Sequence, residues 1–140
     1  MAQLTLRIIT PERIALDEAV EYVWLPGVDG SIGVMARHAP MIAALDFGVL
    51  MYTKPGGARG HIFVSGGFAE VRGDTLRVIS RAGEKPEEID EARAREAERR
   101  ARERLAQRGS AATMSEVNFL RAELALHRAL LRLGTKHSSQ

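Results

Sequence analysis

The feature that most constrains the fold is a change of hydrophobic period near residue 86. Before it, short apolar runs alternate or nearly alternate with polar residues, which is typical of β-strands. After it, the chain is built mainly from Ala, Arg, Glu and Leu, in a helical pattern. A chain of 140 residues forms one domain or two small ones. We therefore expect a strand domain over residues 1–84 and a helical domain over residues 85–140.

The strand domain is predicted to be an antiparallel β-sandwich. Turn-forming pairs such as Gly73-Asp74 bound the apolar runs and recur about every 8–15 residues, with no helical segment between them. This spacing favours a sandwich or barrel over a doubly wound parallel sheet. The predicted strands include residues 4–8, 21–25, 60–64 and 75–79.

The helical domain is predicted to be an antiparallel pair of helices. Pro86 and the acidic residues after it begin the first helix, which should end near residues 109–110. Ser115 can cap a second helix over residues 116–133, ended by Gly134. The fold class is therefore α+β, an N-terminal antiparallel β-sandwich followed by a C-terminal helical hairpin.

The two helices differ in how strongly they can be anchored. The second carries many leucines, whereas the first offers little beyond Ile89, Leu105 and a line of alanines. Apolar burial contributes roughly 25 cal/mol per Å², so an alanine stripe contributes much less than a leucine stripe. We therefore expect the hairpin to be able to leave the body on which it packs.

Composition excludes several classes of protein. The chain has no cysteine, which removes disulfides, thiolate metal sites and cysteine nucleophiles. The longest stretch without Asp, Glu, Lys or Arg covers residues 60–69, far short of the roughly 20 residues of a membrane helix. The charged residues among the first twenty argue against a signal peptide. A net charge of +2 is too small to indicate nucleic-acid binding.

No catalytic residue and no metal site is predicted. The motifs GxSxG, GxGxxG, GxxxxGK[ST] and HExxH are absent, and the four histidines lie far apart in the sequence. The Ser-Gly-Gly at residues 65–67 is interpreted as a tight connection between strands rather than a hydrolase serine. His38, before Ala39-Pro40, is interpreted as a turn or partner-contact residue rather than a general base.

Arginines are concentrated on both predicted helices. On the first they are interleaved with glutamates, as in Glu96 and Arg100, so local ion pairs on a solvated face explain most of them. On the second, Arg121, Arg128 and Arg132 are spaced by 7 and 4 residues and share one face. This stripe suits an acidic partner surface or a polyanion such as a nucleotide phosphate.

Separated motifs, in order along nearly the whole chain, resemble the epsilon subunit of bacterial F-type ATP synthases. Ala36, where the family usually has proline, and a longer connection at residues 108–115 are mild departures that concern loop geometry. The motifs are Gly-Ser-Ile-Gly-Val-Met at residues 30–35, His-Ala-Pro-Met at residues 38–41, Val-Ser-Gly-Gly-Phe-Ala-Glu-Val at residues 64–71, and Phe-Leu-Arg-Ala-Glu-Leu-Ala-Leu-His-Arg-Ala at residues 119–129.

The resemblance implies a non-catalytic subunit of the central stalk, peripheral to the cytoplasmic face of the bacterial inner membrane. Such a subunit binds the gamma subunit and the membrane proteolipid ring and rotates with them. Its hairpin either folds onto the sandwich or extends along gamma toward the catalytic head, where it inhibits ATP hydrolysis. We expect Arg37 and His38 to contact partners, and Arg99 and Arg100 to meet the beta and alpha subunits in the extended state.

A subset of these relatives binds ATP when the hairpin is folded, through a segment of the form Ile/Leu-Asp-x-x-Arg-Ala. Residues 89–94 of this chain match that segment. No cofactor is required, and ATP would be a regulatory ligand, since no glycine-rich loop is present to wrap its phosphates. The alternative is that Asp90 and Arg93 form a surface pair while the second-helix arginines meet acidic partners. The nucleotide-binding residues implied by the resemblance are Glu84, Ile89, Asp90, Arg93, Ala94, Arg128 and Arg132.

A second hypothesis is a free-standing β-sandwich adaptor whose arginine-rich hairpin binds RNA or an acidic protein surface. The interleaved glutamates and the lack of paired exposed aromatic residues weigh against RNA. We therefore expect no nucleic-acid partner.

Overall fold

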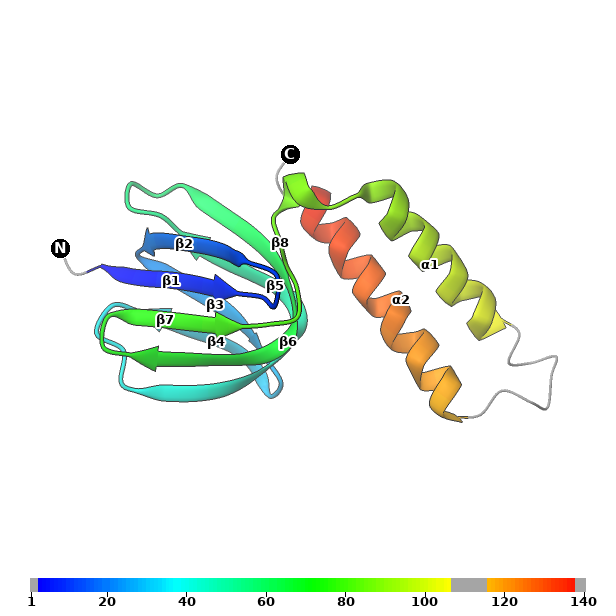
Figure 1. Ribbon diagram of the computed structural model, residues 1–140, viewed down its shortest axis with the longest axis horizontal. Helices are drawn as coiled ribbons and strands as arrows, with labels where there is room; N and C mark the ends of the chain where they lie inside the picture. Colours follow the sequence, from blue (N-terminus) through cyan, green and yellow to red (C-terminus); the bar gives the residue numbers. More distant parts are fainter. Residues whose placement is uncertain (1–2, 107–115, 138–140) are drawn as a thin grey trace.

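The computed structural model describes residues 3–106 and 116–137, with side chains in the last helix from residue 121 onward. A strand body is followed by two antiparallel helices (Figure 1). The predicted end of the first helix near residues 109–110 and the Ser115 cap lie outside the described residues. The elements are β1 (Leu4–Ile9), β2 (Ile14–Val20), β3 (Tyr22–Gly27), β4 (Gly30–Met35), β5 (Met41–Thr53), β6 (Arg59–Arg72), β7 (Thr75–Ile79), β8 (Gly83–Glu84), the 3-10 helix η1 (Pro86–Glu88), α1 (Glu91–Ala106) and α2 (Glu116–His137).

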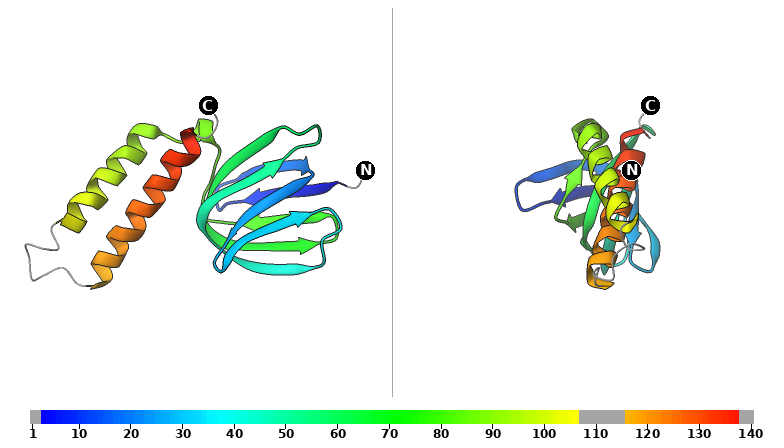
Figure 2. Two further views of the ribbon diagram at one scale, coloured as in Figure 1. Left: turned by 180° about the vertical axis from the view of Figure 1, so that it is seen from behind. Right: turned by 90° about the vertical axis from the view of Figure 1, so that its right-hand side faces the viewer.

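The strands form a two-layered sandwich, as predicted, and the views in Figures 1 and 2 show the layers. The hydrogen-bonded order is β2-β1-β7-β6-β5-β3-β4, with β8 paired to β6. The long strands β5 and β6 pair along most of their length and contribute to both layers. β6 pairs with β8 in its first half and with β7 in its second. The strands therefore form one continuous hydrogen-bonded sheet that folds over to make both layers.

The predicted connection at residues 65–67 is wrong, because these residues lie inside β6. Gly66 and Gly67 have φ angles of +70° and +96°, and they stand where β6 changes partner from β8 to β7. A Cβ atom on Gly67 would lie 1.8 Å from the carbonyl oxygen of Ile79. Glycine is therefore required at this bend by both the backbone conformation and the close approach of β7.

The core lies between the layers and follows the period of two expected for strands. In β1, Leu4, Leu6 and Ile8 are fully buried and alternate with half-buried residues. The buried apolar residues that form one cluster with them are Ala15, Leu16, Val20, Val23, Leu25, Val34, Leu45, Leu50, Tyr52, Ile62, Val64, Ala69, Val71, Leu76 and Val78.

The strand directions add one feature that the sequence pattern did not predict. The turn predicted at Gly73 and Asp74 is confirmed, since it joins antiparallel β6 and β7, with φ of +62° at Gly73. β1 and β7, however, are parallel. They are separated in sequence by most of the sandwich, so no tight turn forces them to run in opposite directions.

Both helices differ from their predicted bounds at one end. Pro86 begins only the 3-10 turn η1, and α1 starts at Glu91 after an extended Ile89. α2 continues through Gly134 to His137. Thr135 is fully buried and donates a hydrogen bond from its Oγ1 to the carbonyl oxygen of Leu131, at 2.8 Å. This packing offsets the cost of about 1 kcal/mol for a helical glycine.

Alanines are the buried apolar residues of the two helices, where side chains are described. Ala94 and Ala101 of α1 and Ala122 and Ala129 of α2 are almost fully buried, and each pair is spaced by seven residues. α2 lies between α1 and the sandwich in Figure 1 and in the left view of Figure 2. The hairpin, meaning α1 and α2, is therefore attached to the sandwich chiefly through α2. The buried residues of α1 are alanines, as the sequence pattern indicated, and its weak anchoring stays a prediction.

Two aromatic contacts join α2 to the long strands. The ring of His127 meets the ring of Phe47 in β5 edge-on, with centroids 5.0 Å apart. The guanidinium carbon of Arg132 lies 4.7 Å from the ring centroid of Phe63 in β6.

Among the described residues, no helix is long and apolar enough to cross a membrane.

Candidate functional site

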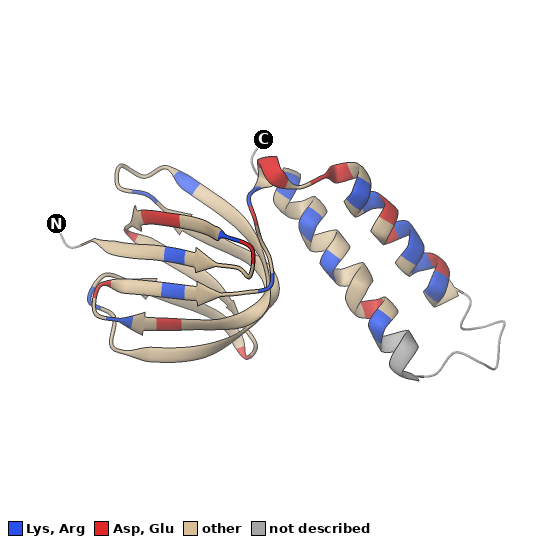
Figure 3. Ribbon diagram, viewed as in Figure 1, with Lys and Arg blue, Asp and Glu red and all other residues tan. Residues whose placement is uncertain are grey.

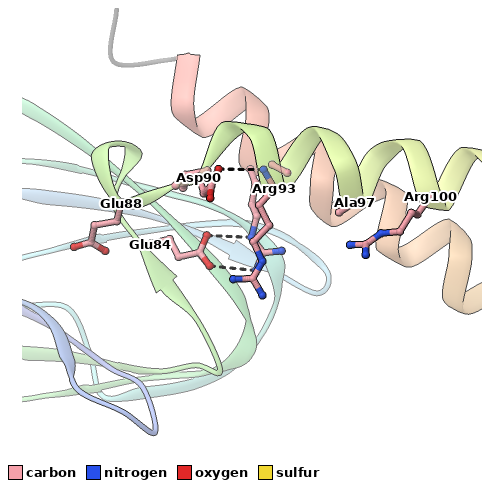
Figure 4. A pocket seen from close by; sticks show the side chains of 9 residues that line it. Glu84, Glu88, Asp90, Arg93, Ala97 and Arg100 are labelled. Atoms are coloured by element: carbon pink, nitrogen blue, oxygen red, sulfur yellow. Dashed lines mark hydrogen bonds and ion pairs between the residues drawn. The ribbon is translucent and has the colours of Figure 1, made fainter.

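A pocket of about 360 Å³ lies where the hairpin meets the sandwich. Its walls come from β8, η1, the start of α1 and the last turns of α2, and Figure 4 shows six of the side chains by name. Six of the seven predicted nucleotide-binding residues line it, all except Arg128. The complete lining is Glu84, Glu88, Ile89, Asp90, Arg93, Ala94, Ala97, Arg100 and Arg132.

Asp90 holds the N-terminus of α1 beside the pocket. Its Oδ1 accepts a hydrogen bond from the backbone N–H of Arg93 at 3.1 Å, and its carbonyl oxygen accepts one from the N–H of Ala94. This is the geometry of a helix N-cap, which satisfies donors that the first turn leaves unpaired. Asp90 and Arg93 are therefore joined through the backbone of Arg93, and no side-chain ion pair joins them as the alternative hypothesis expected.

Arg132 links α2 to the sandwich at the pocket wall. Its Nε donates to Glu84 Oε2 at 3.0 Å and its Nη2 donates to Glu84 Oε1 at 3.2 Å. Both side chains are about 30% exposed. The same guanidinium group stacks over Phe63, so a bidentate ion pair and a cation–π contact act on one side chain.

Two other arginines on the wall carry charge that is not neutralised locally. Within the described part of the chain, the side chains of Arg93 and Arg100 form no hydrogen bond or ion pair, and Arg100 only interacts at longer range with Glu96, which Arg99 already pairs. By contrast, each carboxylate on the wall already has a partner: Glu84 pairs with Arg132, Asp90 caps α1, and Glu88 pairs with an arginine of the β1–β2 turn, Arg13. The pocket is therefore equipped for an anion.

The predicted site lacks two wall residues on α1, and one of its α2 residues lies outside the wall. Arg100 and Ala97 line the pocket, although Arg100 was predicted only as a partner contact. The steps from Arg93 to Ala97 and Arg100 are the four and three residues of one helical face, which is a signal the sequence carries. Arg128, predicted to bind nucleotide, is half-buried and does not belong to the wall, and it has no polar partner among the described residues.

The other arginines of α1 mostly form local ion pairs, as predicted. Figure 3 shows basic and acidic residues interleaved along this helix. Glu96, however, pairs with Arg99 rather than with Arg100. The hydrogen bond from Arg99 holds the pKa of Glu96 below its ordinary value. Arg99 also pairs with Glu103, and its own pKa is raised, first by Glu96. The further i,i+4 pairs are Arg95 with Glu91 and Arg102 with Glu98.

Arg37 and His38 lie in the turn between β4 and β5, so the turn predicted at His38 is confirmed. Arg37 is exposed and has a φ of 65°. The N–H of His38 donates to the carbonyl oxygen of Met35 at 3.2 Å, and its Nδ1 lies 2.7 Å from the carbonyl oxygen of Ala39.

In the described residues, no three His, Cys, Asp or Glu side chains lie together as a metal site would require.

Comparison with known proteins matches both parts of the chain. Residues 3–86 match the family "ATP synthase, Delta/Epsilon chain, beta-sandwich domain", and residues 87–136 match "ATP synthase, Delta/Epsilon chain, long alpha-helix domain". The ATP synthase epsilon chain of Nitratidesulfovibrio vulgaris (strain DP4) is 45% identical over 133 residues, covering 95% of each chain. That of Carboxydothermus hydrogenoformans is 48% identical over 106 residues, covering 76% of this chain and 78% of the relative.

Solved structures show the same fold. A chain of the Euglena gracilis mitochondrial ATP synthase, in a structure of OSCP, F1 and c-ring, aligns with a TM-score of 0.80 at 24% identity. The alignment covers 98% of this chain and 83% of that one. A chain of the Tetrahymena thermophila mitochondrial ATP synthase, from its central stalk and c-ring, aligns with a TM-score of 0.59 at 12% identity, covering 95% and 96%.

A strand sandwich that carries a docked helical pair, matched over residues 3–136, defines a non-catalytic stalk subunit of ATP synthase. The chain belongs to the family of epsilon subunits of F-type ATP synthases. The resemblance drawn from the sequence motifs is thus confirmed, and family membership favours a central-stalk subunit over a free-standing adaptor.

Proposed function

We propose that this subunit binds ATP as a regulatory ligand in the pocket between the sandwich and the folded hairpin. The observation that carries the proposal is a pair of guanidinium groups, Arg93 and Arg100, that have no hydrogen bond or ion pair among the described residues, on a wall whose carboxylates are all engaged. Guanidinium groups bind phosphate oxygens through charge-assisted, often bidentate hydrogen bonds. A volume of about 360 Å³ falls in the range of small-molecule sites.

The remaining predicted residues have complementary roles in this proposal. Ile89 and Ala94 are buried and give the pocket an apolar floor. Glu84 and Asp90 keep acceptor lone pairs beyond those used by Arg132 and by the N–H of Arg93, and these would serve the adenine amino group or the ribose hydroxyls. Arg132 adds a third cation, shared with Glu84, and Arg128, one helical turn earlier on α2, would have to change its rotamer to approach the phosphates.

ATP in this pocket would stabilise the folded hairpin, because its walls come from both sides of the hairpin–sandwich contact. Glu84 belongs to β8, whereas Arg93 and Arg132 belong to α1 and α2. A ligand that binds only the folded state at about 100 times its dissociation constant stabilises that state by about 2.7 kcal/mol. This is enough to shift a nearly balanced equilibrium.

We propose further that the released hairpin extends along the gamma subunit and inhibits ATP hydrolysis. The attachment of α1 through alanines and the arginines exposed along it support this role. Arg99 and Arg100 would then face the catalytic beta and alpha subunits. The sandwich would bind gamma and the membrane proteolipid ring, with Arg37 and His38 among its contacts. The subunit would thereby lie at the cytoplasmic face of the bacterial inner membrane, without entering it.

Titration calorimetry of the isolated subunit tests the ATP proposal. We expect ATP, with or without magnesium, to give a saturable signal in the millimolar range or tighter. We expect replacement of both Arg93 and Arg100 by alanine to weaken binding at least tenfold, because each charge-assisted hydrogen bond contributes about 1.5–3 kcal/mol. Arg102→Ala is the matched control, since Arg102 pairs with Glu98 outside the pocket. Absence of any response to ATP at millimolar concentration would disprove the proposal.

A further inference from the structure

A residue outside the pocket controls one of its carboxylates. Arg13 lies in the turn between β1 and β2, 75 residues before Glu88 in the sequence. Its Nη2 donates to Glu88 Oε2 at 2.6 Å and to the carbonyl oxygen of Gly83 at 3.1 Å. Glu88 belongs to η1 and lines the pocket. One guanidinium group therefore joins the first turn of the sandwich to the segment that leads into the hairpin.

The turn that carries Arg13 is itself fixed by hydrogen bonds. Thr10, almost fully buried, donates from its Oγ1 to the carbonyl oxygen of Arg13 at 3.0 Å, and its N–H donates to the same oxygen at 2.9 Å. The facing segment is equally tight, since a Cβ atom on Gly83 would lie 2.8 Å from Cβ of Ala15. The turn that carries Arg13 and the segment at Gly83, whose carbonyl oxygen accepts from Arg13, are thus packed closely together.

The contact turns the Glu88 carboxylate away from the cations of the pocket. In Figure 4 this carboxylate points to the side opposite Arg93, whereas Glu84 points toward the pocket. The N–H of Lys85 also donates to Glu88 Oε2, at 3.3 Å, and supports the same orientation. Without Arg13, a free carboxylate on the pocket wall would be drawn to Arg93 and Arg100 and would repel a bound anion.

We propose that Arg13 is a positioning residue that sets the pocket's preference for anions by binding Glu88 and keeping its charge out of the site. The inference rests on the ATP proposal above and adds to it a residue that touches neither the ligand nor the pocket. It explains why a site with three carboxylates on its wall still presents free positive charge.

The test is a double-mutant cycle with two probes, ATP and inorganic tripolyphosphate. We expect Arg13→Ala to weaken the binding of both probes about two- to fivefold, the range of partly exposed charge pairs. Glu88→Gln, which keeps an acceptor for the N–H of Lys85, should bind both as tightly as the unmodified subunit or more tightly. The double variant should recover the unmodified affinity, because the charge that Arg13 restrains is no longer present.

Rescue by Glu88→Gln separates this role from a merely structural one. If the double variant binds as weakly as Arg13→Ala, or if Arg13→Ala binds like the unmodified subunit, the inference is wrong while the ATP proposal stands. If the unmodified subunit binds neither probe, both are wrong. Arg77→Ala is the matched control, because Arg77 pairs with Glu70 on a strand remote from the pocket and should leave both affinities unchanged.

Discussion

Replacing Gly67 by alanine is expected to lower the free energy of unfolding by about 3 kcal/mol or more. The new methyl carbon would lie 1.8 Å from the carbonyl oxygen of Ile79, which is backbone and cannot rotate away. The φ of +96° at this position adds conformational strain for any L-residue with a side chain. Urea denaturation followed by circular dichroism measures the loss.

Gly57→Ala is the matched control for this prediction. Gly57 has nearly the same φ, +94°, but no atom within 4 Å of the position a Cβ would take. Its replacement should therefore cost only the conformational term, about 1–2 kcal/mol. Equal losses for the two variants would show that the approach of β7 to Gly67 is not the cause.

Arg132→Ala is expected to shift the hairpin about tenfold toward the released state. The substitution removes both hydrogen bonds to Glu84 and the contact with Phe63. A tenfold shift corresponds to about 1.4 kcal/mol, a value discounted for the partial exposure of the ion pair. In the assembled enzyme, the same variant should inhibit ATP hydrolysis more strongly, if the released hairpin is the inhibitory state.

Distance measurements between two spin labels can follow the release directly. The chain has no cysteine, so cysteines introduced at the exposed positions Ala58, before β6, and Arg104, on α1, are labelled selectively. Arg102→Ala is the control, because it breaks an ion pair within α1 and leaves the sandwich contact intact. An unchanged distance distribution in Arg132→Ala would show that other contacts, such as that of His127 with Phe47, hold the hairpin.

Local pattern predicts the body of the fold but not its bends. The alternation in β1 is enough to place Leu4, Leu6 and Ile8 in the core. A glycine pair has the same local signature in a connection as in a bent strand, however. What decides for Gly66 and Gly67 is pairing with β7 and β8, which lie later in the chain.

The α1 side of the site was predicted through the family resemblance, and helical periodicity could have added to it. Ile89, Asp90, Arg93 and Ala94 come together because α1 begins there, and Arg100 follows from the same periodicity. The α2 side depends on how the helices pack, and packing brings Arg132 to the wall but not Arg128. The contact of Arg13 with Glu88 joins residues 75 positions apart, so only the tertiary structure reveals it.

The N-cap formed by Asp90 satisfies a backbone donor at the start of α1 without any group of the sandwich. Asp90 and the i,i+4 pairs of Glu91 with Arg95 and Glu98 with Arg102 are all local in sequence, and none uses an atom of the sandwich. On the proposed release, undocking would therefore leave the first turn intact, and α1 would travel as a preformed rod without melting and refolding on its way. Its proposed reorientation would then be a rigid-body movement, with a speed set by breaking a few contacts rather than by nucleating a new helix.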